Sequence, residues 1–457
     1  VKISGLNAFA VAKAIFRPID RRQDSKTNAL LANQGKKRKA FEFESHRLYY
    51  GHIFDPQNGV MLDEVLLSAM KAPQTYTRED VVEINAHGGA VVLDAILQLV
   101  LKMGARLAEP GEFTQRAFAN GRIDLTQAEA VIDVINARTQ KSLQLAASQA
   151  SGKLRKQITS IRSRLVDLLA RIEASIDFPD DVAELIQTED TLKSLQREVL
   201  EPLKGLIRNY MDAHIFRDGL AVAVVGRPNV GKSSLLNQLI QKDRAIVTDV
   251  PGTTRDVIEE TLSLKGIPVV ISDTAGVHDT DHPVEKIGIK KTLEHVNGSD
   301  LVLFMIEANR PLGPEDHLIY DQINSKSIIV VLNKIDLIQK GDETTLPNDW
   351  RFDDQVRISA LYDQGIDQLK DKVVKMAGGQ NSFNFSGMIV PNLRHKLLLE
   401  TSLDAAESVI QQLQNGTFSD LVAIHVQEAL DALGVISGDN VKVDVLDQIF
   451  SRFCVGK

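Results

Sequence analysis

The spacing of apolar residues in the first part of the chain predicts strands followed by helices. Up to about residue 115, short apolar runs alternate with polar loops, which favours strands at 47–54, 60–69 and 80–85 and a helix at 91–103. From 126 to about 176, apolar residues recur three and four positions apart with no proline between them. This spacing predicts a pair of long amphipathic helices.

A charged helix is expected next, over residues 191–216, and the pattern changes again at Gly219. The segments that follow are continuous apolar runs separated by helix-length stretches, and they lie at 220–225, 269–272, 301–306 and 328–332. Runs of this kind are typical of strands buried on both faces. Strands that alternate with helices predict a doubly wound, mostly parallel sheet.

After Gly378 the chain returns to helical patterns at 396–413, 421–433 and 445–453. The simplest arrangement is a helical domain made from two distant halves, with an α/β domain inserted between them. The predicted fold class is therefore multidomain, combining α+β and α/β parts. The expected divisions are an N-terminal α+β domain at 1–117, helical parts at 118–216 and 379–457, and the α/β domain at 217–378.

Composition places the chain among ordinary globular proteins. It has 457 residues, of which 43% are hydrophobic and 25% charged, and this excludes collagen-like, low-complexity and wholly disordered classes. No apolar run is long enough to cross a bilayer. Cys454 is the single cysteine and no secretory signal opens the chain, so we expect a reducing cytoplasm. Since Val1 stands where Met would be, we also expect that residues are missing from the start.

The net charge of −8 is unevenly distributed. Residues 1–50 carry 11 Lys and Arg against 4 Asp and Glu, so the rest of the chain is acidic. The densest basic cluster is Lys36–Lys39, for which a solvated loop is the simpler interpretation and a phosphate-attracting patch the alternative. Composition alone does not predict a nucleic-acid-binding protein.

Residues 226–233 read Gly-Arg-Pro-Asn-Val-Gly-Lys-Ser and match a phosphate-binding loop. The glycines let backbone N–H groups turn toward phosphates, Lys232 would contact the β- and γ-phosphates, and the Ser233 hydroxyl would bind Mg²⁺. A buried strand precedes the loop and an amphipathic segment follows it, so the phosphates would lie at a helix N-terminus.

Three later motifs favour a guanine nucleotide. Asp273-Thr274-Ala275-Gly276 follows one predicted strand, where Asp can hold Mg²⁺ through water and the Gly amide can sense the γ-phosphate. Asn333-Lys334-Ile335-Asp336 follows another, and a carboxylate there can accept from guanine N1–H and the 2-amino group. Ser359-Ala360-Leu361 would close the base pocket from the next strand. Together these motifs predict a GTPase rather than an ATPase.

The residue after Gly276 is Val277, whose aliphatic side chain cannot orient the attacking water. Hydrolysis must therefore be assisted from elsewhere. Thr254 can supply a second hydroxyl to Mg²⁺, and Glu285 is the favoured water-orienting residue. Arg255 as an internal arginine finger is the alternative that remains.

The chain resembles the MnmE/TrmE family of tRNA-modifying GTPases over nearly its whole length. The resemblance is carried by the GTPase motifs and by four further segments: Val81–Gly89, Pro110–Phe118, Ala174–Pro179 and Phe453–Lys457. It implies an N-terminal domain that dimerises and binds a tetrahydrofolate one-carbon donor, 5-formyl- or methylene-tetrahydrofolate, a helical domain and an inserted Ras-like GTPase domain. It also implies a flavin-dependent partner, MnmG, with which the wobble uridine of certain tRNAs gains an aminomethyl or carboxymethylaminomethyl group at C5.

The resemblance assigns site residues in this numbering. Folate contacts would be Lys2, Glu83, Arg122 and Lys457, with Lys2 standing where the family usually has Arg. Potassium, which activates the family's GTPases, would be held by Asn229, Thr248, Val250 and Thr253, and the catalytic acid would be Glu285. The expected catalytic residues are Glu285, Lys232 and Thr254. The expected nucleotide site comprises Asn229, Val230, Gly231, Lys232, Ser233, Ser234, Thr248, Asp249, Val250, Pro251, Gly252, Thr253, Thr254, Asp273, Thr274, Ala275, Gly276, Asn333, Lys334, Asp336, Ser359, Ala360 and Leu361.

Three alternatives remain open at this point. A ribosome-assembly GTPase that binds rRNA usually has a second GTPase domain or a KH domain, and the sequence has one phosphate loop and no Gly-x-x-Gly after Gly379. A folate-dependent aminomethyltransferase with a regulatory GTPase is the second. Thirdly, Cys454 could be a nucleophile, but no His lies near it in sequence to lower its pKa, which favours a small apolar role.

Overall fold

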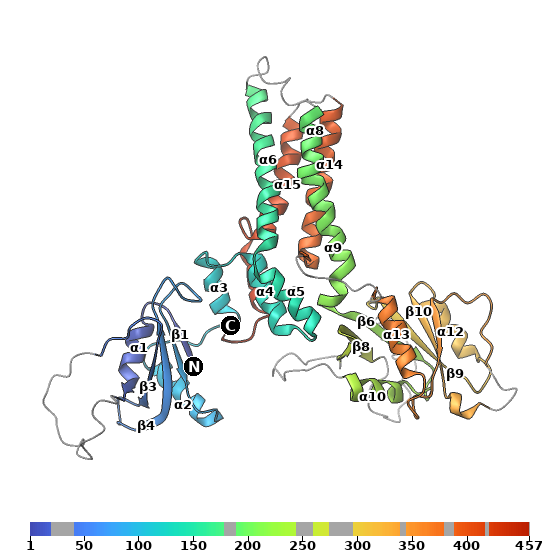
Figure 1. The fold of residues 1–457 in the computed structure, drawn as a ribbon, viewed down its shortest axis with the longest axis horizontal. Helices are drawn as coiled ribbons and strands as arrows, with labels where there is room; N and C mark the ends of the chain where they lie inside the picture. Colours follow the sequence, from blue (N-terminus) through green and yellow to red (C-terminus); the bar gives the residue numbers. More distant parts are fainter. Residues whose placement is uncertain are drawn as a thin grey trace. The chain divides into compact units, whose positions relative to one another are not determined.

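The computed structural model describes residues 1–19, 41–177, 189–243, 259–273, 296–338, 344–378, 388–415 and 420–456. The chain forms two compact units, one of residues 1–132 and 437–457 and the other of residues 133–436 (Figure 1). The predicted domain boundaries at residues 117, 216 and 378 stay a prediction. Among the described residues, no helix has the length and apolar character that a bilayer span requires.

The first unit is built on a five-stranded antiparallel sheet with the order β1-β5-β4-β3-β2. Its strands are β1 (Lys2–Ser4), β2 (Phe16–Pro18), β3 (Arg47–Phe54), β4 (Met61–Met70) and β5 (Val81–Asn85). Helices α1 (Ala8–Ile15) and α2 (Ala90–Lys102) share one apolar core with this sheet. The predicted strands at 47–54, 60–69 and 80–85 and the helix at 91–103 are confirmed; β1 and β2 span three residues each, too short to show a period.

The first unit also holds helices from both ends of its sequence. These are α3 (Glu112–Ala119), the start of α4 (Leu125–Asn136) and α16 (Val443–Phe450). Leu125, Ala128, Phe450 and Phe453 lie in one buried cluster, so the C-terminal segment packs beside α3 and α4. The C-terminal segment therefore belongs to the same compact unit as the N-terminal sheet. The sequence pattern alone does not show this.

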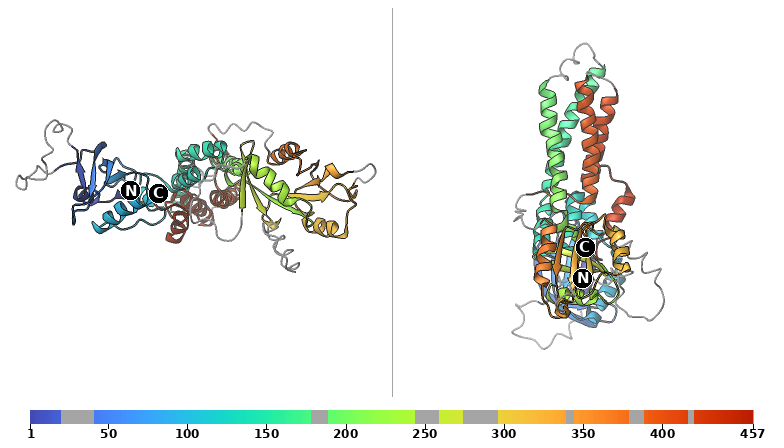
Figure 2. Two further views of the ribbon diagram at one scale, coloured as in Figure 1. Left: turned by 90° about the horizontal axis from the view of Figure 1, so that it is seen from below. Right: turned by 90° about the vertical axis from the view of Figure 1, so that its right-hand side faces the viewer.

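A helical bundle makes up part of the second unit, as two views show (Figures 1 and 2). Its helices are α6 (Lys153–Asp177), α8 (Glu189–Leu195), the π-helical η1 (Gln196–Leu200), α9 (Glu201–Asp218), α14 (Leu393–Gln414) and α15 (Asp420–Ser437). One buried cluster contains residues from 154–206 and from 399–436. Segments separated by about half the chain therefore share one core, because each buries the apolar stripe that its periodicity predicted.

The expectation of two long helices between 126 and 176 is wrong, because the segment forms three: α4, α5 (Gln140–Ala150) and α6. Thr139 begins α5 with a capping box, in which its side chain accepts from the N–H of Ser142. Gly152, with φ 75°, separates α5 from α6. Capping residues therefore divide this segment into separate helices, although its apolar spacing continues across the breaks.

The second unit also contains a six-stranded sheet with the order β11-β10-β9-β6-β8-β7, parallel except where β7 pairs with β8. Its strands are β6 (Leu220–Gly226), β7 (Glu259–Leu264), β8 (Ile267–Asp273), β9 (Leu301–Glu307), β10 (Ile328–Asn333) and β11 (Asp354–Arg357). The helices beside it are α10 (Lys232–Asp243), α12 (Pro314–Ile323) and α13 (Ile366–Met376), with the short 3₁₀ turn η2 (Ile335–Leu337) after β10. The predicted mostly parallel sheet is confirmed, with β7 as an antiparallel edge strand.

Helices cover both faces of this sheet. Val222 and Val224 of β6 face a core that includes residues of α10 and α13, whereas Ala223 and Val225 face the core of α12. Alternation of the two faces along a fully apolar strand explains why these strands read as continuous apolar runs. The carboxyl ends of the parallel strands then meet at one edge of the sheet, where ligands bind in folds of this class.

Candidate functional site

At two positions of the loop after β6, the backbone conformation and the neighbouring atoms leave room only for glycine. Gly226 has φ 155°, and a Cβ there would lie 2.5 Å from the carbonyl oxygen of Met305. Gly231 has φ 104°, and a Cβ there would lie 2.2 Å from Nδ2 of Asn333. Asn229 between them is exposed and left-handed, with φ 60°. The glycines of the phosphate-loop pattern are therefore required by close backbone approach.

Lys232 closes this loop on itself. Its Nζ donates to the carbonyl oxygens of Gly226 and Arg227, each at 2.9 Å. Ser233 and Ser234 are exposed in the first turn of α10, while Val230 is buried beneath the loop. A cation and the N-terminus of a helix thus lie at one place, an arrangement that suits an anionic group.

Asn333 joins three of the predicted motifs. It lies at the end of β10 and is 3% exposed. Its Nδ2 donates to the Val230 carbonyl at 2.8 Å, and its Oδ1 accepts from the Ala360 N–H at 3.0 Å. Because both ends of one buried amide are used, Asn333 fixes the phosphate loop relative to the segment after β11.

Beside Asn333 lie the side chains proposed to read a base. Asp336 is exposed on η2, and its Oδ1 accepts from the Ser359 hydroxyl at 2.5 Å. Ser359 is fully buried, so its hydroxyl holds the Asp336 carboxylate in one orientation. Leu361, two residues after Ser359, is 69% exposed. Lys334, with φ 66°, pairs with Glu307, which is 4% exposed. A carboxylate held in one orientation can accept from two N–H donors of a planar ring.

Other predicted nucleotide residues are only partly described or lie outside the described residues. The backbone of β8 ends at Asp273, opposite Val224 of β6, so the 273–276 motif begins beside the phosphate loop. The predicted residues that lie outside the described part are Thr248, Asp249, Val250, Pro251, Gly252, Thr253, Thr254, Thr274, Ala275, Gly276 and Glu285, together with Arg255 and Val277. The basic cluster at 36–39 also lies outside it.

In the first unit, three of the four predicted folate residues are close together. Lys2 and Glu83 are register partners on β1 and β5, and Lys2 Nζ lies 3.1 Å from Glu83 Oε1. The Arg122 guanidinium lies 4.6 Å from the ring centre of Tyr76, and Lys2 Nζ lies 5.9 Å from the same centre and 5.6 Å from that of Phe113. Sequence reasoning missed both aromatic residues. The fourth residue, Lys457, lies outside the described residues.

A pocket of about 570 Å³ lies in the same unit. Its walls come from residues 1–8, from α2 and the segment 104–108, from α3 and from the C-terminal residues Val455 and Gly456. Val455 forms a β-bridge with Pro110, and the Gly111 N–H donates to the Cys454 carbonyl at 3.5 Å. The end of the chain thus lies along the start of α3 and reaches the pocket wall.

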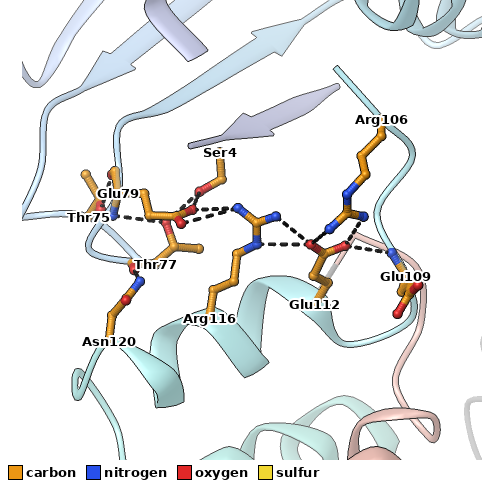
Figure 3. A network of polar contacts seen from close by, with 9 residues as sticks. All are labelled: Ser4, Thr75, Thr77, Glu79, Arg106, Glu109, Glu112, Arg116 and Asn120. Carbon is orange, nitrogen blue, oxygen red and sulfur yellow. Dashed lines mark hydrogen bonds and ion pairs between the residues drawn. The ribbon is translucent and has the colours of Figure 1, made fainter. Parts of the chain in front are cut away.

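One wall of the pocket is a charged network (Figure 3). Arg116 of α3 donates to Glu112 Oε1 at 3.0 Å through Nε and to Glu79 Oε2 at 2.9 Å through Nη1. Ser4 of β1 donates to the same oxygen of Glu79 at 2.8 Å, and Arg106 donates to Glu112 Oε2 at 2.8 Å. The network ties α3 to the edge strand β1. The resemblance includes these α3 residues, but nothing in the sequence pairs them with Glu79 or Arg106.

The pKa of Glu112 is lowered to about 2. Burial opposes ionisation and raises the pKa, but hydrogen bonds from Arg106, from the Glu109 N–H and from Arg116 outweigh it. A lowered pKa in the folded state means that ionised Glu112 stabilises the fold at neutral pH. Ionised Glu112 contributes roughly 2 to 3 kcal/mol to the free energy of unfolding. This is less than the full pKa shift would give, because Arg106 is 63% exposed and solvent weakens its ion pair with Glu112.

We expect this contribution to disappear in acid. It is fully present above pH about 4.5, the ordinary value, and is lost as pH falls through the folded value of about 2. The free energy of unfolding of Glu112→Gln should therefore depend less on pH across that window than that of the parent. Chemical denaturation at a series of pH values measures it. Glu109→Gln, an exposed carboxylate three residues away, is the control, and equal slopes in the two variants would contradict the prediction.

Comparison with known proteins gives two family matches that together cover nearly the whole chain. The family model described as the MnmE helical domain matches residues 125–454, and that described as the N-terminus of the GTP-binding protein TrmE matches residues 1–122. A curated tRNA modification GTPase MnmE from Thermoanaerobacter pseudethanolicus is 44% identical over 457 residues, 100% of this chain and 96% of the relative. The relatives of the same name from Carboxydothermus hydrogenoformans and Streptococcus sanguinis are 44% and 42% identical, over 100% of this chain and 96% and 95% of their own lengths.

Proposed function

Because the chain belongs to the MnmE family of tRNA modification GTPases, we propose that it hydrolyses GTP in the modification of tRNA wobble uridines. With a flavin-dependent MnmG-type partner, and with tetrahydrofolate as the one-carbon donor, it adds an aminomethyl or carboxymethylaminomethyl group at C5 in the cytoplasm. The observation that carries the proposal is the full-length likeness of 44%, joined to a phosphate loop held in place by Asn333.

In this proposal GTP lies along the carboxyl edge of the sheet. Its phosphates take the place of the Gly226 and Arg227 carbonyls as partners of Lys232, since a phosphate oxygen is a stronger acceptor for an ammonium group. The guanine N1–H and 2-amino groups donate to Asp336, which Ser359 orients. The exposed Ser233 hydroxyl fits a Mg²⁺ ligand, with Thr254 as the second hydroxyl.

Folate binding is proposed for the pocket of the first unit. A volume of about 570 Å³ falls within the usual range for ligand pockets of roughly 300–1,000 Å³. Lys2 and Phe113 line the pocket, whereas Glu83, which pairs with Lys2, and Arg122 and Tyr76 are not among the lining residues. Arg122 and Lys457 are proposed as further cations for the glutamate tail and Glu83 as the acceptor for the pterin N–H groups. The aromatic rings of Phe113 and Tyr76 offer apolar surface of the kind that planar ligands stack on.

An exposed apolar face supports the proposed homodimer of N-terminal domains. Leu48 and Tyr50 of β3 are 60% and 39% exposed, and Leu66 of β4 is 42% exposed. Tyr50 and Leu66 are register partners, so they lie side by side on one face of the sheet. Apolar side chains grouped in this way are typical of surfaces that contact another chain.

The proposed function is tested by analysing tRNA nucleosides. Cells that lack the protein should lose the modified wobble uridine, and the parent gene should restore it. Normal wobble uridines in such cells, with defective ribosome assembly, would favour the rRNA-binding alternative. In the purified system, turnover of a protein-bound aminomethyl group without turnover on tRNA would favour the aminomethyltransferase.

We predict that GTP hydrolysis requires K⁺ and is slow in Na⁺, because Val277 cannot orient water and K⁺ takes the place of an arginine finger. Asn229 is exposed on the loop, which leaves its Oδ1 available as a ligand, and Thr248, Val250 and Thr253 are the further ligands that the prediction names. Asn229→Ala should lower the rate and abolish the response to K⁺. Rates in KCl and NaCl at equal ionic strength are the measurement. Equal rates would transfer the role to Arg255.

A further inference from the structure

Arg227, the second residue of the phosphate loop, does not point its charge at the place proposed for the phosphates. Its Nε lies 3.0 Å from Oδ1 of Asp316, in the first turn of α12. The side chain of Arg227 is 18% exposed and that of Asp316 is 0% exposed. A guanidinium committed to a buried carboxylate is held in one orientation.

The surroundings of Asp316 fit this partner closely. Asp316 Oδ2 accepts from the Gly313 N–H at 2.9 Å, which caps α12. A Cβ on Gly313 would lie 3.0 Å from Arg227 Nη1, so the glycine leaves the space that the guanidinium occupies. A buried carboxylate is costly unless it is both paired and hydrogen-bonded, and Asp316 has one partner of each kind.

The main chain of Arg227 also accepts a hydrogen bond from Lys232, the lysine of the phosphate loop. The carbonyl oxygen of Arg227 accepts from Lys232 Nζ at 2.9 Å, and Gly226 before it is fixed against Met305 by close approach. The side chain of Arg227 is therefore attached to α12, while its main chain belongs to the loop whose carbonyls hold the ammonium of Lys232 in this structure. Loss of the side-chain anchor leaves the backbone of the loop at Arg227 free to change direction.

We propose that the Arg227–Asp316 pair anchors the phosphate loop to α12 and that Arg227 is a positioning residue for nucleotide phosphates. The inference rests on the proposed GTP site and adds to it the element that holds the loop in its binding conformation. Because the anchor acts at the phosphate end, it affects nucleotide diphosphates and triphosphates alike. It leaves base selection to Asp336 at the other end of the site.

The test measures affinities of the full-length protein for GDP, IDP and a non-hydrolysable GTP analogue by fluorescence competition, with the thermal midpoint of each variant. Arg227→Ala should weaken GDP and the GTP analogue about tenfold or more, because it leaves the buried carboxylate of Asp316 without its ion-pair partner. The preference for GDP over IDP should stay within about twofold of the parent's, and Arg227→Lys should recover part of the affinity. Lys265→Ala, which removes an exposed ion pair with Asp371 in the same unit, should change none of these values.

A double-variant cycle with Asp316→Asn separates an anchoring pair from two independent residues. If the pair acts as a unit, Arg227→Ala combined with Asp316→Asn loses no more affinity than the more affected single variant. Additive losses, a lost preference for GDP over IDP, or unchanged affinities with a lower thermal midpoint would each overturn the inference. A parent protein that fails to bind guanine nucleotides would instead overturn the proposed GTP site, which keeps the two failures distinct.

Discussion

Replacement of Asp336 by Asn is expected to lower the affinity for GTP by roughly 10- to 100-fold, or about 1 to 3 kcal/mol. Asp336 accepts the Ser359 hydroxyl at 2.5 Å, and the proposal gives its carboxylate the guanine N1–H and 2-amino donors. An Asn side chain brings an NH₂ group into a position that needs an acceptor, so a donor faces a donor. The same change should improve binding of xanthosine triphosphate, whose 2-oxo group accepts where guanine donates.

Equilibrium competition among GTP, ITP and xanthosine triphosphate measures this change. Asp363→Asn is the matched control, because Asp363 is an exposed carboxylate of the same unit that pairs with Lys242. The control should retain the parent's order of affinities. An Asp336→Asn protein that binds GTP as tightly as the parent would remove Asp336 from base recognition and would leave the guanine specificity unexplained.

Those parts of the fold and site that depend on local pattern could be predicted from sequence. The strands β6, β9 and β10 are apolar on both faces, so a buried parallel sheet could be predicted from their continuous apolar runs and the helical segments between them. Gly226 and Gly231 were recognised as glycines of a phosphate-binding loop, and both have positive φ values, 155° and 104°. In these cases one residue type satisfies the physical requirement, and the requirement is visible in the sequence.

Features that depend on distant pairs could not be predicted. Arg227 and Asp316 are 89 positions apart, and Arg116 meets Glu79 from 37 positions away; neither sequence segment carries a sign of the other. The break between α5 and α6 was missed for a different reason. Apolar spacing continues through Ser151 and Gly152, and the left-handed glycine that ends the helix has no effect on periodicity.

Glu285→Ala is expected to reduce kcat for GTP hydrolysis by on the order of 10²-fold or more while GTP affinity stays close to the parent's. Val277 follows the 273–276 motif, and an aliphatic side chain there cannot orient water, so another group must do so. Glu285 lies outside the described residues, and its role is predicted from the sequence and from the family resemblance. A residue that orients or polarises the attacking water acts on the transition state, so its loss should affect kcat rather than ground-state binding.

Single-turnover kinetics in K⁺ separate this role from that of a surface carboxylate, because they measure the chemical step without product release. Glu315→Ala is the control, since Glu315 is exposed at the start of α12 and is expected to change the rate by no more than about twofold. Nucleotide affinities of both variants should match the parent's. A normal single-turnover rate in Glu285→Ala, with dimerisation intact, would remove Glu285 from the mechanism. The catalytic role would then fall to Arg255 or to the bound cation.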